Sequence, residues 1–309
     1  MGGTASLASQ VNRALFAIFH PDESRHAAKH QGVADRAIYS YATLRTYRQR
    51  CLTLLNILPQ DCRPRLLRDL TTAHIERGIA LLKARDVSDA HIKTILAAVR
   101  KLVWGMRELG WSTMQPDDLV PAALNEGLIA SPPRGGYSEE QIVQLRLYVR
   151  AQRQPSELLR LFDLILASGL RHDEAARLWE SDLTRQFGFI RVRGTNAKGG
   201  RERTVGPSLD REGLIALRAA IAAIPSGRHE LWPGGPGLAR RLAETIRAGC
   251  KDLGYVCKGI HGLRATFAAR YIDRQLAEGT PERIARLRVS RMLGHNRIDV
   301  TYRYAAKRS

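Results

Sequence analysis

Four short segments in the second half of the chain carry side chains suited to chemistry on a phosphate ester. They combine arginine, lysine, histidine and tyrosine with glycine and small apolar residues, and together they are far more specific than any one of them alone. In chain order they are residues 168–174, 197–203, 261–267 and 293–295, the last followed by Tyr304.

Two arginines in these segments suit the non-bridging oxygens of a phosphodiester. The guanidinium groups of Arg171 and Arg264 offer planar, bidentate donors. In-line attack on a phosphodiester builds negative charge on those oxygens, so both arginines would stabilise the transition state more than the ground state. His261 precedes Arg264 by three residues. On a helix the two share a face and can serve one phosphate.

Tyr304 is the candidate nucleophile. A tyrosine hydroxyl has a pKa of about 10, so it needs a base or a strongly cationic site to attack phosphorus. His261 can supply the base and the arginines the positive charge. Lys198, in a glycine-rich turn, can give a proton to the leaving sugar oxygen, and His295 can donate a hydrogen bond to the phosphate.

The chemistry predicted from these residues uses neither metal nor nucleotide. No Walker loop, carboxylate cluster or zinc spacing accompanies them, and a half-site made by Cys257 and His261 lacks a CxxC or HxxxH partner. A phosphotyrosine ester would conserve the phosphate energy, so rejoining would require no ATP. We therefore expect no cofactor, and strand exchange or relaxation rather than hydrolysis.

Each position has an ordinary explanation when taken singly. Arg171 can end a helix at the surface, His261 can be a satisfied core histidine, and Lys198 can simply be solvated. Tyr302 competes with Tyr304, because residues two apart on a helix point about 200° from each other and only one can face the phosphate. Six positions in the right order, type and spacing are hard to obtain by chance.

This set resembles the tyrosine recombinases, also called phage integrases. Their pattern is an arginine in a GLRxxE segment, a lysine in a β-turn, HxLR, and LGH with a tyrosine nine residues later. The nine-residue spacing holds between His295 and Tyr304. The likeness covers most of residues 137–305, and over residues 40–125 it extends only to the architecture of a helical core-binding domain.

The resemblance implies a site-specific recombinase that clamps double-stranded DNA between two domains. It also implies a homo-oligomer, a tetramer on paired sites, with accessory DNA-bending proteins as possible partners. It implies that Glu174 supports the site without direct chemistry. The sequence departs from the pattern at Ala265, where the family often has histidine, and only five residues follow Tyr304. Residues 1–37 are a hypothetical substitute for a subunit contact made elsewhere by a longer tail.

Two alternatives remain: a type IB topoisomerase that relaxes DNA with nearly the same groups, and a catalytically silent DNA-binding accessory protein. The biological role is open between phage integration, mobile-element transfer, cassette insertion and chromosome-dimer resolution.

The composition agrees with a DNA-binding protein. The 309 residues carry 49 Lys+Arg against 30 Asp+Glu, a net charge of +19 spread along the chain. Such a surface matches a polyanion, nucleic acid before an anionic membrane. Four cysteines without a CxxC pair indicate a reduced cytoplasmic chain, and no apolar run reaches the ~18 residues of a membrane span. We expect a prokaryotic protein of the cytoplasm, associated with the nucleoid.

The elements that position these residues are mostly helices. Apolar residues recur at helical spacing from about residue 40 to 105, and again near 138–152, 155–169, 210–224, 237–253, 262–277 and 281–293. Residues 187–193 and 201–205 read as a β-hairpin. We predict a mainly α fold with a small antiparallel sheet, divided into an N-terminal segment (1–37), a helical core-binding domain (38–130), a linker (131–136) and a catalytic domain (137–309).

Overall fold

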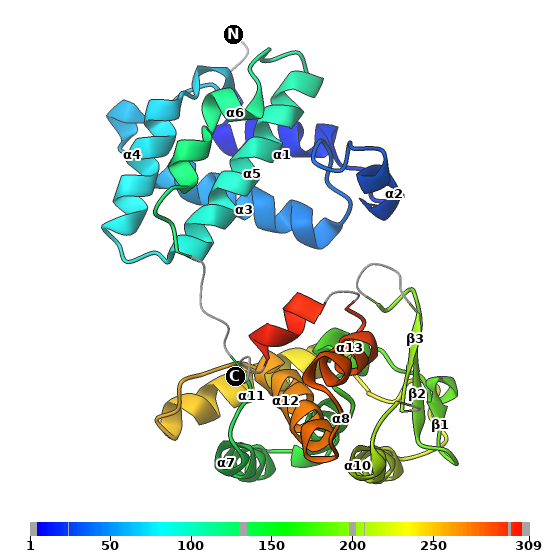
Figure 1. The fold of residues 1–309 in the computed structure, drawn as a ribbon. Helices are drawn as coiled ribbons and strands as arrows, with labels where there is room; N and C mark the ends of the chain where they lie inside the picture. The colour runs from blue at the N-terminus through cyan, green and yellow to red at the C-terminus, as the bar shows by residue number, and fades with distance from the viewer. Residues whose placement is uncertain are drawn as a thin grey trace. The chain divides into compact units, whose positions relative to one another are not determined.

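The computed structural model describes residues 5–23, 25–129, 135–197, 202–206, 208–295 and 298–304. The chain divides into two compact units, Met1–Pro132 and Pro133–Ser309, and each has its own hydrophobic core (Figure 1). The boundary falls within the expected linker, 131–136, of which residues 131–134 lie outside the described residues. Within the described part of the chain, no helix is long and apolar enough to cross a membrane.

The first unit is a helical bundle. Its long amphipathic helices bury one apolar stripe each, and their polar faces carry the charges. The α-helices are α1 (Leu7–Ala17), α2 (Arg25–His30), α3 (Tyr41–Ile57), α4 (Thr72–Lys83), α5 (Asp89–Glu108) and α6 (Pro116–Leu119), with short 3-10 turns at Gln60–Cys62, Leu67–Asp69 and Ala122–Asn125.

The N-terminal helix differs from the expectation of a separate segment. Val11, Ala14 and Leu15 of α1 are fully buried in the same core as α3 and α5. A Cβ atom at Gly105 of α5 would fall on the backbone of Ala14, so the glycine allows the two helices to cross at close range. Residues 7–17 are therefore part of the bundle.

The second unit is mainly helical with one small sheet, and the predicted fold class is confirmed. Helix α8 lies at its centre and packs against α7, α10, α11 and α12. The elements are α7 (Glu139–Arg150), α8 (Pro155–Ser168), α9 (His172–Ala176), a 3-10 turn (Glu180–Asp182), β1 (Leu183–Thr184), β2 (Phe189–Val192), β3 (Arg203–Val205), α10 (Arg211–Ala222), α11 (Gly235–Asp252), α12 (His261–Ala277), α13 (Glu282–Met292) and the 3-10 helix η5 (Ile298–Arg303).

The sheet is antiparallel in the order β1-β2-β3, and Ile190 of β2 pairs with Val205 of β3. The hairpin predicted from the sequence corresponds to β2 and β3, while the two-residue strand β1 had no sequence signal of its own. Figure 1 shows the sheet at one edge of the unit, beside α10 and α13. Strand β3 contacts α13, which brings the sheet next to the segment that ends in His295.

Candidate active site

The first site segment begins where α8 ends. Gly169 takes a left-handed conformation (φ 63°), and a Cβ atom there would overlap the ring of Phe267. Only glycine meets both demands at little cost. The turn aims the carbonyl of Gly169 at the guanidinium of Arg264, whose Nη1 donates to it. Arg171 follows as the residue that precedes α9.

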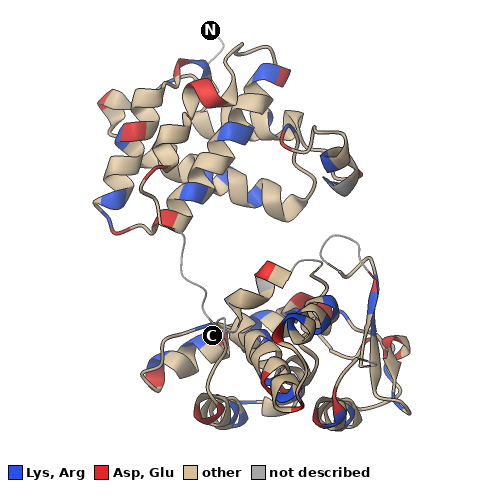
Figure 2. Ribbon diagram, in the orientation of Figure 1, with Lys and Arg blue, Asp and Glu red and all other residues tan. Residues whose placement is uncertain are grey.

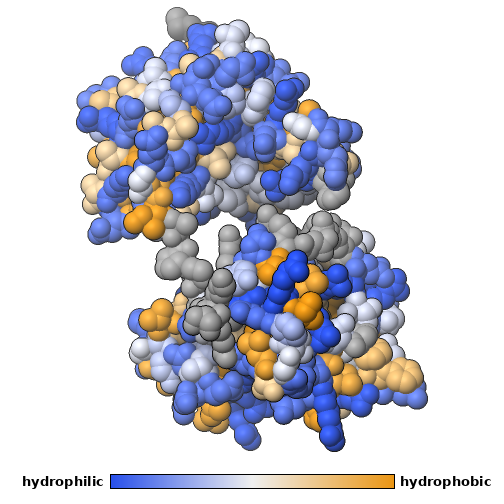
Figure 3. Space-filling view, in the orientation of Figure 1, coloured by the Kyte–Doolittle hydropathy of each residue, from blue (hydrophilic) through white to orange (hydrophobic). Residues whose placement is uncertain are grey.

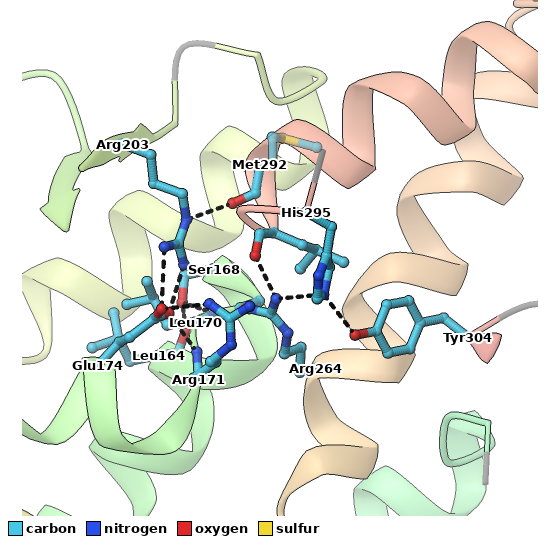
Figure 4. A network of polar contacts seen from close by, with 12 residues as sticks. Leu164, Ser168, Leu170, Arg171, Glu174, Arg203, Arg264, Met292, His295 and Tyr304 are labelled. Carbon is cyan, nitrogen blue, oxygen red and sulfur yellow. Dashed lines mark hydrogen bonds and ion pairs between the residues drawn. The ribbon is translucent and has the colours of Figure 1, made fainter. Parts of the chain in front are cut away.

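A buried carboxylate organises two arginines beside this turn. Glu174 is 1% exposed, and its oxygens lie 2.6 Å from Arg171 Nη1 and 2.6 Å from Arg203 Nη2 (Figure 4). The backbone N–H of Arg171 also donates to it, at 2.9 Å. Burial alone raises the pKa of Glu174, but the bonds and charges of Arg203 and Arg171 outweigh it and lower the pKa to about 2. Glu174 is therefore ionised at neutral pH.

Arg264 is the most deeply buried cation of the site, with 1% of its surface exposed. Besides the Gly169 carbonyl, its Nη2 reaches the carbonyl of Leu293 at 2.5 Å and His295 Nε2 at 3.2 Å. Burial lowers its pKa to about 10, so it still carries its charge at neutral pH. Its Nε has no hydrogen-bond partner among the described residues, which leaves one buried donor for a bound anion.

His295 links this arginine to the candidate nucleophile. Its Nε2 lies 3.0 Å from the hydroxyl of Tyr304 (Figure 4). Because arginine has only donors, the contact with Arg264 assigns the lone pair to Nε2, and the Tyr304 hydroxyl then donates to the same atom. Burial lowers the pKa of His295 to about 4, and Arg264, Arg171, His261 and Arg203 add to this. The ring is thus neutral at neutral pH.

The two C-terminal tyrosines lie in different surroundings. Tyr304 is 8% exposed, and its ring centroid lies 5.9 Å from that of His261 and 6.1 Å from that of His295. Tyr302 is 39% exposed, and its ring packs against the buried guanidinium of Arg286, 4.1 Å from its centroid. Tyr304, and not Tyr302, is in contact with the histidines.

The structure places five of the seven residues singled out in the sequence in two contact groups, Arg171 with Glu174 and Arg264 with His295 and Tyr304, and His261 lies against the ring of Tyr304. Those five are Arg171, Glu174, Arg264, His295 and Tyr304. Lys198 lies outside the described residues. In the described part of the chain, no three His, Cys, Asp or Glu side chains form a group that could hold a metal ion.

Arg203 belongs to the site network, although its place in the sequence predicted no role for it. It stands in the quoted segment 197–203, where a charged residue in a short hairpin reads as solvent-facing. The available signal was strand alternation: Val205 is buried, so Arg203, two residues earlier, points to the same face of the sheet.

Comparison with curated proteins found one similar sequence over most of the chain. Over 304 residues the chain is 27% identical to tyrosine recombinase XerC of Chromobacterium violaceum, with 91% of this chain and 89% of the relative covered. By sequence this chain is similar to the tyrosine recombinases. No family model matches it.

Solved structures show the same tyrosine recombinase fold. A lambda integrase dimer bound to a COC′ core site matches with a TM-score of 0.67 and 17% identity, covering 99% of this chain and 79% of that one. The Tn1549 transposon integrase with transposon right end DNA matches with a TM-score of 0.58 and 15% identity, covering 93% of this chain and 96% of that one. The XerH recombinase on a palindromic difH substrate matches with a TM-score of 0.60 and 15% identity, covering 96% of this chain and 91% of that one.

Proposed function

We propose that this tyrosine recombinase is a site-specific DNA recombinase or integrase that cleaves and rejoins DNA through a 3′-phosphotyrosine bond at Tyr304. The observation that carries the proposal is the chain of contacts from Tyr304 through His295 to Arg264, with Arg171 fixed beside it by Glu174. It places a tyrosine hydroxyl among fixed cationic groups, which is what attack on a phosphodiester needs.

In this reaction the oxygen of Tyr304 forms a bond to phosphorus while the bond from phosphorus to the 5′ oxygen breaks. Arg171 and Arg264 stabilise the charge that grows on the non-bridging oxygens, and the unpartnered Nε of Arg264 gives one donor for it. We propose that Lys198 protonates the 5′ oxygen. Reversal of the same steps rejoins the strand, so these side chains perform the reaction without metal or ATP.

Two imidazoles flank the nucleophile, and we assign them different roles. A pKa of about 4 makes His295 a weak base at neutral pH, so His295 orients the hydroxyl and then contacts the phosphate. His261, whose ring lies 5.9 Å from the Tyr304 ring between centroids, takes the phenolic proton. A negatively charged phosphate entering the site would raise the pKa of His295.

The partner is double-stranded DNA, bound in our proposal by the helical unit (38–130) and the catalytic unit (137–309) after the linker 131–136. The similar lambda integrase structures are DNA-bound dimers and a tetramer on a Holliday junction, and the XerH structure also contains DNA. We propose a tetramer on paired sites, aided by accessory DNA-bending proteins. Such a complex would act on the nucleoid in a prokaryotic cytoplasm.

The test is covalent capture of DNA. The full chain is mixed with fragmented DNA of its own host, denatured, and the DNA that remains attached to protein is sequenced. We expect one enriched site, adduct formation by Tyr302→Phe, and none by Tyr304→Phe. Loss of the adduct in Tyr302→Phe instead would assign the nucleophile to Tyr302. Relaxation of a plasmid that lacks the site would favour topoisomerase activity, and DNA binding without any adduct would favour an accessory protein.

A further inference from the structure

Arg203 makes an unusual set of bonds for a residue of a short surface sheet. Its side chain is 10% exposed, and all three of its nitrogens donate hydrogen bonds. Nε donates to the carbonyl of Met292 at 2.9 Å, while Nη1 and Nη2 donate to the two oxygens of Glu174 at 3.1 and 2.6 Å (Figure 4). One guanidinium therefore ties strand β3 to both α9 and the end of α13.

Both anchors of Arg203 adjoin a candidate catalytic group. Glu174 holds Arg171 through a second pair of bonds, to its side chain and to its backbone N–H. Met292 stands three residues before His295. Arg171 and His295 come from distant parts of the sequence. The side chain of Arg203 bonds both to Glu174, which holds Arg171, and to the Met292 carbonyl near His295.

The turn that carries His295 is built around the Arg203 side chain. Gly294 has φ 68°, and a Cβ atom there would lie 3.1 Å from Arg203 Nη1 and 3.3 Å from its Cδ. The left-handed turn and this close approach both favour glycine. The backbone bond from His295 N–H to the Ser290 carbonyl, at 2.8 Å, closes the turn.

We propose that Arg203 is a positioning residue that sets the separation between the Arg171 guanidinium and the His295 ring, and so the place of the scissile phosphate between them. The proposal rests on the function proposed above. We assign Arg203 no direct contact with the phosphate, because its guanidinium is turned to Glu174 and Met292 with one bond from each nitrogen and its side chain is 10% exposed. Its planar fork is what the two anchors require, since a lysine ammonium is a single point charge and cannot span both in that geometry.

The sheet supplies a matched control for a purely structural role. Arg193, just after β2, also pairs with a buried carboxylate, with its Nε 2.6 Å from an oxygen of Asp182, which is 1% exposed. Its other contacts are the Ser181 hydroxyl and the ring of Trp179, 3.9 Å from the guanidinium. Arg193→Met therefore removes a comparable buried ion pair without touching the supports of Arg171 or His295.

The experiment measures single-turnover cleavage at saturating enzyme, using a nicked duplex that carries the site recovered by covalent capture. DNA affinity is measured separately. We expect Arg203→Met to slow cleavage about 100-fold while the dissociation constant for DNA changes less than about 3-fold, since misplacement of reacting groups by ~1 Å costs about that much. Arg193→Met should change the cleavage rate by less than about 3-fold. Arg203→Lys, which keeps part of the network, should fall between Arg203→Met and the wild type.

Equal slowing by Arg203→Met and Arg193→Met would overturn the proposal, and so would weaker DNA binding with a normal rate at saturation. If Arg203→Met does not fold, Arg203→Lys carries the comparison: a rate equal to that of the wild type overturns the proposal, and a rate about 10-fold lower supports it.

A readout without DNA separates this proposal from the proposed function. If the wild type forms no covalent adduct, the proposed function fails, and NMR titration of the histidines still reports on Arg203. Arg203 is one of the cations that lower the pKa of His295, so Arg203→Met should raise that pKa and Arg193→Met should leave it unchanged. An unchanged His295 titration in Arg203→Met would overturn the positioning role by itself.

Discussion

The two units of this chain bury different kinds of side chain. Among the described residues, the first unit buries one large polar side chain, the amide of Gln10, in an otherwise apolar core. The described part of the second unit buries four charged side chains, Glu174, Asp182, Arg264 and Arg286. Buried charges are tolerated only when they are paired and hydrogen-bonded, so the second unit depends on exact partners where the first depends on shape.

The surface charge follows the same division. Of the 49 Lys+Arg residues, 32 lie after Pro132, against 18 of the 30 Asp+Glu, which gives +14 for the second unit and +5 for the first. Figure 2 shows basic residues on both units, and in the view of Figure 3 the apolar surface is broken into small patches on each. The candidate catalytic residues therefore lie in the unit that also buries charge, whereas the described part of the helical bundle buries no charged side chain.

Removal of the central carboxylate should have the largest effect. Glu174→Leu leaves Arg171 and Arg203 without a counterion, and breaking a buried ion pair costs about 3–5 kcal/mol of unfolding free energy. Amide hydrogen exchange, read by segment, should show lost protection in α9, β3 and α13 and none lost in the first unit.

Glu202→Leu is the matched control, because Glu202 pairs with Arg191 at the exposed surface of the same sheet. Its exchange should be close to that of the wild type. Protection that is equal in the two variants would show that the second unit does not rely on its buried charges, and would remove the contrast between the units.

A substitution in the bundle tests shape instead of charge. Gly105→Ala places a Cβ atom on the backbone of Ala14 and forces α1 away from α5, which should cost up to about 3 kcal/mol as core overpacking does. Gly237→Ala in α11 is the control, since nothing lies within 4 Å of the added atom, and it should stabilise the protein by up to about 1 kcal/mol. Urea unfolding of both variants gives the two values; a loss in Gly237→Ala as large as that in Gly105→Ala would contradict the role of shape.

The same contrast explains how far the sequence could predict the structure. Helical periodicity located the long helices, because one buried apolar stripe per helix is enough to mark them. Periodicity did not place α1 in the bundle, because the position of α1 is fixed by contacts between residues far apart in the sequence. For example, Gln10 Nε2 donates to the carbonyl of Arg65, and Gln10 Oε1 accepts from the N–H of Leu67.

At the site, residue type and spacing predicted Arg171, Arg264, His295 and Tyr304, which the structure places in one network. Spacing could not predict Arg203, whose role depends on a carboxylate 29 residues earlier and a carbonyl 89 residues later. The motifs marked the groups expected to meet a substrate and one supporting group, Glu174, whereas the contacts of Arg203 are visible only once the chain is folded.

Acidification should cause the smallest loss of stability of these tests, and the loss should fall on the second unit, which contains His295. The pKa of His295 in the folded chain is about 4, below the ~6.5 of an unfolded histidine. Between these values the unfolded chain binds more protons, so stability contributed by the neutral ring is complete above pH ~6.5 and is lost as the pH falls toward 4. The expected loss between pH 7 and pH 5 is at most about 2 kcal/mol and is smaller to the extent that solvent screens the half-buried ring, and it comes well before Glu174, with its pKa of about 2, is protonated.

His295→Gln keeps an acceptor for Arg264 and Tyr304 but cannot titrate, so urea unfolding of this variant should depend much less on pH over the same interval. Hydrogen exchange assigns the loss: in the wild type, α12 and α13 should lose protection between pH 7 and pH 5 while the buried stripes of α3 and α5 keep theirs, once rates are corrected for intrinsic exchange. If His295→Gln shows the same pH dependence as the wild type, the acid sensitivity comes from another group, and the buried network around His295 is not what distinguishes the second unit.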